Sequence, residues 1–283
     1  MSKCDLHIHS IYSDGNCTPS EIVKDAKRLG VRCISLTDHD TVAGIPEVVA
    51  AGKEFDIEII PGIEVSAESD MGSVHVLGYF VQADNEDFKK EVTSFQENRH
   101  ERNLKIIQKF NDFGIHIELE ELQNKFPAGQ IGRPHFAHIL VDKGYVGSYK
   151  EAFDRFLGDG RPVHIRNLRP TVKEAIDLIH MGGGISSLAH PIRLNPKIDK
   201  QFEETLRTFK EFGLDALECY SGSHSREAIK RFIQLTEQYD LLVTGGSDFH
   251  SKNKLGVELG CSRDNLFIPY ELVEKLKIFQ ESV

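Results

Sequence analysis

Short apolar runs alternate along the chain with longer segments in which apolar residues recur every three or four positions. The short runs are rich in β-branched residues and most end in polar residues, which is typical of strands. They are CDLHIHS (4–10), CISLTDHD (33–40), IEIIPGIEVS (57–66), SVHVLGYFV (73–81), GGISSLAHP (183–191), ALECYSG (216–222) and LLVTGGSDFH (241–250). The alternation predicts an α/β fold with a largely parallel sheet and crossover helices. About seven such units favour a closed or nearly closed barrel, in which functional residues gather at the C-terminal ends of the strands.

The segment after the first run carries clear signals of a helix. Thr18 is a capping residue, Pro19 suits the first helical position, and Gly30 ends the pattern. The apolar residues between them recur at helical spacing, at Ile22, Val23, Ala26 and Leu29. Similar patterns predict helices over residues 171–183, 200–213, 225–240 and 270–280.

One long region interrupts this alternation. Residues 84–169 are mostly helical in pattern, and Ile106, Ile107 and Phe110 mark one buried face on an otherwise charged first segment. We therefore expect a helical insertion between strands 4 and 5 that caps the barrel mouth. The predicted domains are the first part of the barrel (1–83), the insertion (84–169) and the second part of the barrel (170–283).

Composition narrows the function classes. A formal net charge of −10 argues against wrapping duplex DNA or binding an anionic membrane, although bound cations would still permit a phosphorylated substrate. No apolar run approaches the roughly 18 residues of a membrane span, and the N-terminus lacks a signal-peptide pattern, so a cytoplasmic protein is expected. The five cysteines contain no C-x-x-C pair, which disfavours a disulfide framework or a zinc finger.

Histidine and acidic residues stand on or just after six of the predicted strands. His7 and His9 are two positions apart, so both imidazoles point to one face of the first strand. The whole set is His7, His9, Asp14, His39, Glu64, His75, His190, Asp248 and His250. Imidazole and carboxylate together suit divalent cations such as Mn²⁺, Zn²⁺ or Fe²⁺. Any one of these residues could be a satisfied polar group at a strand end, but clustered carboxylates in a barrel need compensating cations.

Five motifs along the chain, DLHIHS, TDHDT, GIEVS, AHP and SDFH, resemble the signatures of the PHP (polymerase and histidinol phosphatase) domain family. The resemblance implies a distorted (β/α)₇ barrel, which agrees with the seven strands predicted above. The shorter segments SDG, GRPHFAHIL and CYSGSHS are similar to the branch of RNase AM (also called TrpH) and the 3′,5′-nucleoside bisphosphate phosphatases.

The resemblance also implies a trinuclear metal centre. The implied ligand sets are His7, His9, Glu64 and Asp248 for one ion, Glu64, His75 and His190 for a second, and Asp14, His39 and His250 for the third. Three divalent ions are expected, with Mn²⁺ preferred and Fe²⁺ or Zn²⁺ as alternatives. A water or hydroxide that bridges two of the ions would attack phosphorus. The expected catalytic residues are Asp248, His250 and His224.

Substrate recognition is predicted for the insertion and the later loops. Arg133 offers a planar fork to a phosphate, and His135 is close to it in sequence. Arg193 and His224 flank the predicted mouth of the barrel. The resemblance places Arg133 and His224 at the substrate and suggests that His224 donates a proton to the leaving oxygen.

The expected function is hydrolysis of phosphate esters of nucleotides, of the 5′-AMP or 3′,5′-nucleoside bisphosphate type. A 5′-to-3′ exoribonuclease acting on short RNA, an amidohydrolase-like metal hydrolase and a non-catalytic metal-bound module remain alternatives. The second is disfavoured because no lysine stands at a strand end, and the third because no predicted ligand is missing. A small phosphorylated substrate, a nucleotide or a short RNA, is the expected partner, with no duplex DNA and no membrane.

Overall fold

The computed structural model describes residues 2–69, 72–127, 131–165, 169–195, 197–251, 258–261 and 267–282. Seven strands in these ranges form one sheet in chain order. They are β1 (Lys3–Ile8), β2 (Val31–Leu36), β3 (Glu58–Ser69), β4 (Gly72–Tyr79), β5 (Ile185–Leu188), β6 (Ala216–Ser221) and β7 (Leu242–Gly246). The two edges approach each other, because the amide of Asp248 donates to the carbonyl of His7 over 3.0 Å and that of His9 to Phe249 over 2.9 Å. The predicted seven-stranded, nearly closed barrel is confirmed.

One strand runs against the others. Strand β4 pairs antiparallel with both β3 and β5, whereas the β1–β2, β2–β3, β5–β6 and β6–β7 pairs are parallel. The connection between Ser69 and Gly72 is too short for the dozen or more residues of a parallel crossover. Because β4 runs in the opposite direction, His75, early in β4, pairs with Ser66 near the C-terminal end of β3. His75 therefore lies at the same end of the barrel as Glu64 and His39.

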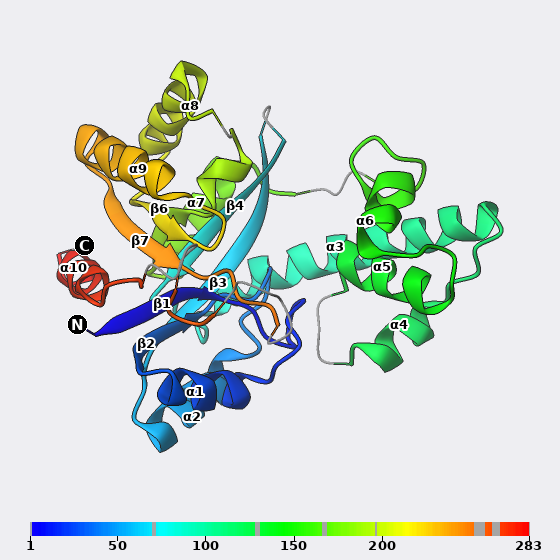
Figure 1. Cartoon of the computed structure of the whole chain (residues 1–283), viewed down its shortest axis with the longest axis horizontal. Coiled ribbons are helices and arrows are strands. Elements are labelled where there is room, and N and C mark those ends of the chain that lie inside the picture. Colours follow the sequence, from blue (N-terminus) through cyan, green and yellow to red (C-terminus); the bar gives the residue numbers. More distant parts are fainter. Residues whose placement is uncertain are drawn as a thin grey trace.

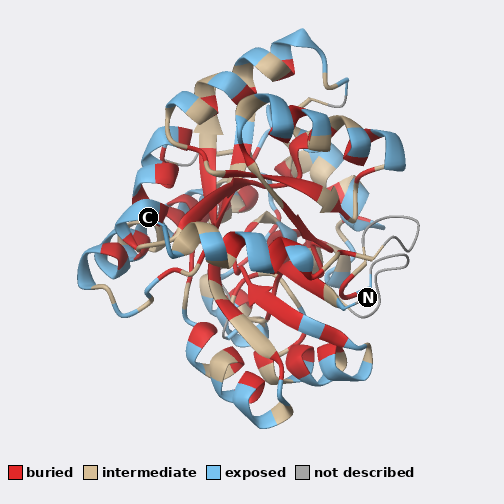
Figure 2. Cartoon of the chain, turned by 90° about the vertical axis from the view of Figure 1, so that its left-hand side faces the viewer, coloured by how far each residue is buried: buried red, intermediate tan, exposed pale blue. Residues whose placement is uncertain are grey.

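Helices cover the outside of the barrel, which leaves the strands buried (Figures 1 and 2). They are α1 (Pro19–Arg28), α2 (Ile45–Phe55), α7 (Val172–Met181), α8 (Lys200–Glu211), α9 (Arg226–Tyr239) and α10 (Glu271–Gln280), with a short 3₁₀ turn, η2 (Pro191–Arg193). Helices α1 and α7 begin at capping boxes, in which Thr18 pairs with Glu21 and Thr171 with Glu174. Among the described residues, none of the helices is both long and apolar enough to span a membrane.

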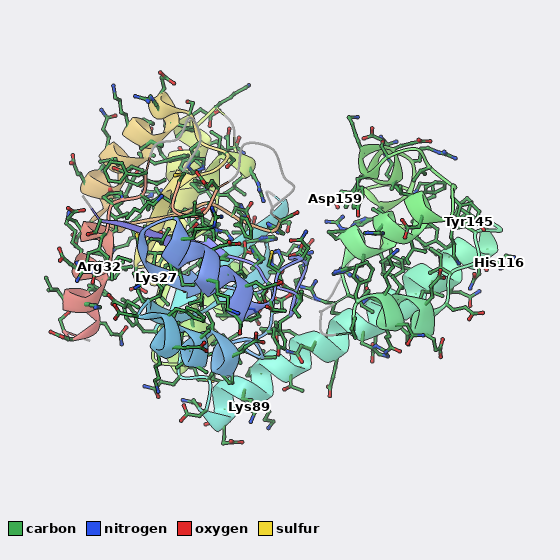
Figure 3. The ribbon with its side chains drawn as sticks, turned by 60° about the horizontal axis from the view of Figure 1, so that its bottom comes forward. Lys27, Arg32, Lys89, His116, Tyr145 and Asp159 are labelled. Carbon is green, nitrogen blue, oxygen red and sulfur yellow. The ribbon has the colours of Figure 1, made fainter. Side chains whose placement is uncertain are left out.

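The described residues between β4 and α7 are mostly helical. They form α3 (Glu86–Asp112), α4 (Leu119–Lys125), α5 (Arg133–Asp142), α6 (Tyr149–Ala152) and a π-helical turn, η1 (Phe153–Leu157). Helix α3 leads from the barrel to a separate group of helices, the helical part, which has an apolar cluster of its own around Phe110, Phe136 and Leu140 (Figure 1). Figure 3 shows His116 and Tyr145 at the far end of this part and Asp159 on the side that faces the barrel.

Candidate metal centre

All nine side chains predicted as metal ligands lie together at one end of the barrel. Each belongs to at least one group of three or four residues whose nitrogen or oxygen atoms lie within 4.8 Å of one another. The groups are His9, Asp14, His39 and His250; His7, Glu64 and His190; His7, His9 and Asp248; and His39, Glu64 and His75. The four groups share members and therefore form one cluster. Its residues belong to β1, β3 and β4 and to the segments that follow β1, β2, β5 and β7.

Four donor atoms converge at the base of this cluster. The Nε2 atoms of His7 and His9 lie 3.1 Å apart, and they lie 3.2 and 3.1 Å from Oε2 of Glu64. They also lie 3.5 and 3.4 Å from Oδ1 of Asp248. Ligands about 2.1 Å from a tetrahedral ion stand about 3.4 Å apart, so the spacing of these atoms fits a divalent cation.

The second oxygen of Glu64 faces another pair of imidazoles. Its Oε1 lies 2.8 Å from Nδ1 of His75 and 3.1 Å from Nε2 of His190. Nδ1 of His39 lies 3.1 Å from the other oxygen, Oε2. The two oxygens of one fully buried carboxylate therefore face separate sets of histidines, as a carboxylate that bridges two cations requires.

Asp14 gathers the remaining ligands at the outer side of the cluster. Its carboxylate lies 3.3 Å from Nε2 of His250, 3.9 Å from Nε2 of His39 and 3.8 Å from Nδ1 of His9. The rings of His9 and His250 stack with their centroids 4.1 Å apart. These spacings are wider than those around Glu64, and the donors remain of the type that Mn²⁺, Fe²⁺ or Zn²⁺ accepts.

The cluster holds its carboxylates ionised. Burial raises the pKa of Glu64, but the facing His39, His7 and His75 outweigh it and hold the pKa well below its usual value. Burial lowers the pKa of His7, yet Glu218 and Glu64 raise it well above the ordinary value. Burial dominates at His190 and lowers its pKa to about 4. Protons on some imidazoles thus balance the carboxylates, and cations that bind here would displace them.

The backbone is tightly constrained around these ligands. A Cβ atom on Gly246 would lie 2.1 Å from the Cβ of His7, so only glycine allows β7 to approach β1 this closely. His190 and Asp248 have backbone φ angles of 28° and 56°, in a region that residues other than glycine rarely adopt. Such residues cluster at functional sites, where the surrounding structure holds them.

Sequence reasoning missed a buried carboxylate that supports the ligands. Glu218 on β6 is fully buried, and its Oε1 lies 2.9 Å from Nδ1 of His7. Its Oε2 accepts the backbone N–H of His190 over 2.5 Å. A carboxylate at Nδ1 fixes the ring orientation and leaves Nε2 free for a metal. The signal in the sequence is a lone acidic residue inside the apolar strand ALECYS.

A cavity of about 210 Å³ is lined by seven of the predicted ligands and by five arginines: Arg99, Arg102, Arg133, Arg169 and Arg193. Arg99 is paired with Asp40, Arg193 with Asp248, and Arg133 with Asp159 at 2.6 Å. The Nε atoms of the buried Arg99 and Arg102 have no hydrogen-bond partner.

Arg102 is unusual among these arginines. It is a buried guanidinium that forms an ion pair with no acidic residue in the described part of the chain, and its NH2 donates to the side chain of Asn103 over 2.8 Å. Burial, together with Arg99, Arg169 and Arg133, lowers its pKa to about 8. A buried cation without a counter-charge is costly, so Arg102 marks a place where an anion would bind favourably.

The other predicted substrate residues are divided between the cavity and its surroundings. Arg133 and Arg193 line the cavity, whereas His135 and His224 are buried and are not among its lining residues. Nδ1 of His135 accepts the N–H of Gly132 over 2.8 Å, and Nδ1 of His224 donates to the carbonyl of Cys219 over 2.8 Å. Nε2 of His224 has no partner, so the predicted proton donation by this residue stays a prediction.

Comparison with known proteins identifies the family. A family model described as the PHP domain matches residues 5–259. The chain belongs to the PHP domain family. A 5′-3′ exoribonuclease of Haemophilus influenzae is 33% identical over 248 residues, which cover 88% of this chain and 90% of the relative. A 3′,5′-nucleoside bisphosphate phosphatase of Chromobacterium violaceum is 29% identical over 272 residues, which cover 93% of each chain.

A solved structure extends the comparison to the fold of this PHP protein. A protein of Bifidobacterium adolescentis, described as a metal-dependent phosphoesterase, has a TM-score of 0.86 at 28% identity and covers 98% of this chain and 96% of its own. The predicted family, barrel fold and enzyme class, a phosphoric ester hydrolase, are thereby confirmed.

Proposed function

We propose that this PHP protein hydrolyses phosphate esters of nucleotides, of the 5′-AMP or 3′,5′-nucleoside bisphosphate type, with three divalent cations, most favourably Mn²⁺. The observation that carries the proposal is a single cavity lined both by five arginines and by seven of the nine side chains of the metal-binding cluster, to which the buried His7 and His9 also belong. Cations held by the cluster and guanidinium groups in the same cavity would together create a site for a substrate with more than one negative charge.

His7, His9, Glu64, Asp248 and their neighbours would hold the cations, as the donor spacing permits. Divalent cations in such a site supply Lewis acidity toward phosphoryl oxygens and an activated water at neutral pH. Arg193, which pairs with Asp248, stands where it can move its guanidinium to a phosphoryl oxygen. Fixed positive charge of this kind stabilises the negative charge that develops during phosphoryl transfer.

The arginines on α3 and at the start of α5 would bind a second phosphate of the substrate. Arg102 lacks an acidic partner in the described part of the chain, and Arg133 presents a planar fork beside it. A bound phosphate would neutralise Arg102 and add hydrogen bonds to both residues. Residues 84–169, which carry these arginines, would act as a cap domain on a barrel formed by 1–83 and 170–283.

One observation favours the 5′-to-3′ exoribonuclease as a second candidate. A smaller cavity of about 70 Å³ shares Arg102, Arg133 and Arg169 with the main one and also contains Ser73 and His164. Because the two cavities share these arginines, the phosphates of a short RNA could extend from one into the other, although Glu68 and Asp159 also line the smaller one. The relatives act on both kinds of substrate by name, so the assay must include each.

The test is a hydrolysis assay on protein stripped of metal and reloaded with Mn²⁺. The substrates are p-nitrophenyl phosphate, 5′-AMP, adenosine 3′,5′-bisphosphate and a 5′-labelled RNA pentamer. Release of phosphate from AMP or from the bisphosphate would support the phosphatase, and release of mononucleotides from the pentamer would support the exoribonuclease. Failure to cleave any of the four substrates would refute the proposed function.

A further inference from the structure

Among the described residues that line the cavity at the metal centre, only one contributes an aromatic hydrocarbon ring. The described lining is otherwise made of polar and charged side chains, with Gly132 and Pro134 as the exceptions. Phe153 provides that ring and is only half-buried. Its inner side packs against the apolar cluster of the helical part, so its remaining surface borders the cavity. An apolar face in a strongly charged cavity needs an explanation beyond packing.

The backbone around Phe153 is specialised. The ring is carried by the first residue of the π-helical turn η1, in which the N–H of Gly158 donates to the carbonyl of Phe153 over 2.9 Å. A Cβ on Gly158 would lie 2.7 Å from that carbonyl oxygen, so the closing residue must be glycine. π-Helical turns are rare and frequently occur at functional sites.

The same turn also holds one of the arginines. Arg133 donates to the carbonyl of Leu157 over 3.2 Å and pairs with Asp159, which lies on the side of the helical part that faces the barrel (Figure 3). Residues 153–159 therefore fix a guanidinium and present an aromatic ring to one cavity. A ligand that uses both must combine an anionic group with a flat, apolar group.

We propose that Phe153 is the stacking platform for the nucleobase of the substrate, which makes it a specificity-determining residue. The inference rests on the proposed function for the substrate class and adds that the enzyme selects nucleotides over base-free sugar phosphates. Stacking tolerates any base, because each has a π face, and this platform should therefore discriminate little among the four bases. Loss of one stacked base typically weakens binding on the order of ten- to a hundredfold.

The kinetic test compares Phe153→Leu with wild type on two matched substrates, adenosine 3′,5′-bisphosphate and the same sugar bisphosphate without its base. Leucine keeps an apolar side chain but removes the π face. We expect kcat/KM for the nucleotide to fall about ten- to a hundredfold while that for the base-free substrate stays within about twofold. Equal losses on both substrates, or no loss on the nucleotide, would overturn the proposal.

Phe156→Leu is the matched control. Phe156 belongs to the same π-helical turn but packs against Phe110, with the ring centroids 5.9 Å apart, and it does not line the cavity. We expect this variant to treat both substrates as wild type does. A nucleotide-specific loss in Phe156→Leu as large as that in Phe153→Leu would mean that packing of the turn, not the ring at the cavity, causes the effect.

A binding test separates this inference from the proposed function. The chain contains no tryptophan, so Phe153→Trp introduces the only tryptophan, which can be excited selectively over the seven tyrosines. We expect 5′-AMP, but not ribose 5-phosphate, to quench its emission, whereas the exposed Phe113→Trp at the end of α3 should respond to neither. Unquenched emission of Phe153→Trp at millimolar AMP would overturn the platform even if the enzyme hydrolyses nucleotides. Absence of hydrolysis by the wild-type protein would instead refute the proposed function. In that case, quenching of Phe153→Trp by 5′-AMP would still show whether a base stacks at this position.

Discussion

Glu218→Gln tests how one buried carboxylate prepares two of the predicted metal ligands. Both oxygens of Glu218 accept hydrogen bonds, from Nδ1 of His7 over 2.9 Å and from the N–H of His190 over 2.5 Å. Glutamine has one acceptor oxygen, so one of the two contacts must face its NH₂ group instead. If the NH₂ group meets His7, it favours the tautomer with the proton on Nε2, which cannot bind a metal.

The expected loss follows from these contacts. A buried N–H left without an acceptor costs about 1–3 kcal/mol, and removal of a carboxylate that orients a ligand histidine lowers metal affinity on the order of 10- to 100-fold. We therefore expect Glu218→Gln to bind Mn²⁺ about 10- to 100-fold more weakly while remaining folded. Part of the lost activity should return at high metal concentration, because the ligands themselves are intact.

Calorimetric titration of metal-free protein with Mn²⁺ measures this loss directly. Glu58→Gln is the matched control, since Glu58 contacts Tyr270 and Lys277 and belongs to no metal-binding group. It should lose stability without losing metal affinity. Wild-type affinity for Mn²⁺ in Glu218→Gln would refute the reasoning, and so would an equal loss in the control.

Three variants and a change of pH test the other parts of the proposed site. His9→Ala and Asp248→Asn should each lower kcat by more than about a hundredfold with an unchanged far-UV spectrum, and near-normal turnover in either would remove that residue from the centre. Arg102→Met removes a buried cation, so it should raise the free energy of unfolding in urea by about 1–3 kcal/mol and weaken nucleotide hydrolysis. A variant less stable than wild type would show that the charge of Arg102 is compensated in the folded protein. Metal affinity should fall as the pH is lowered, about tenfold per unit for each proton displaced, because the carboxylates raise the pKa of His7 and His9. Calorimetry in two buffers of different ionisation enthalpy counts those protons, and a count of zero would contradict the charge balance described for the cluster.

The barrel and the ligand cluster could be predicted because their signals are local. The β-branched runs define the strands, and acidic residues or histidines at their ends fall at one end of a barrel for geometric reasons alone. The antiparallel direction of β4 was also accessible from the sequence, because the expected strands 57–66 and 73–81 leave only six residues between them, fewer than a parallel crossover needs. What the pattern did not show is that β3 extends to Ser69 and pairs with β4 along its whole outer half.

The supporting residues could not be predicted, because their roles depend on contacts distant in sequence. Arg99 and Arg102 belong to a helix whose charged residues resemble a solvated face, yet both are buried against the barrel and the cavity. Glu218 is separated from His7 by 211 positions, and only the closed barrel brings them together. The sequence predicts an ordinary helix for the segment that contains Phe153. The π-helical turn could not be predicted there, because it depends on one hydrogen bond from the N–H of Gly158 to the carbonyl of Phe153.

Anomalous X-ray diffraction at the manganese edge, on crystals grown from protein loaded with Mn²⁺, tests the central claim most directly. The account predicts three anomalous peaks, each surrounded by members of the nine-residue cluster, with Glu64 between two of them. A map with no peak in the cluster, or with peaks only at other sites, would contradict it.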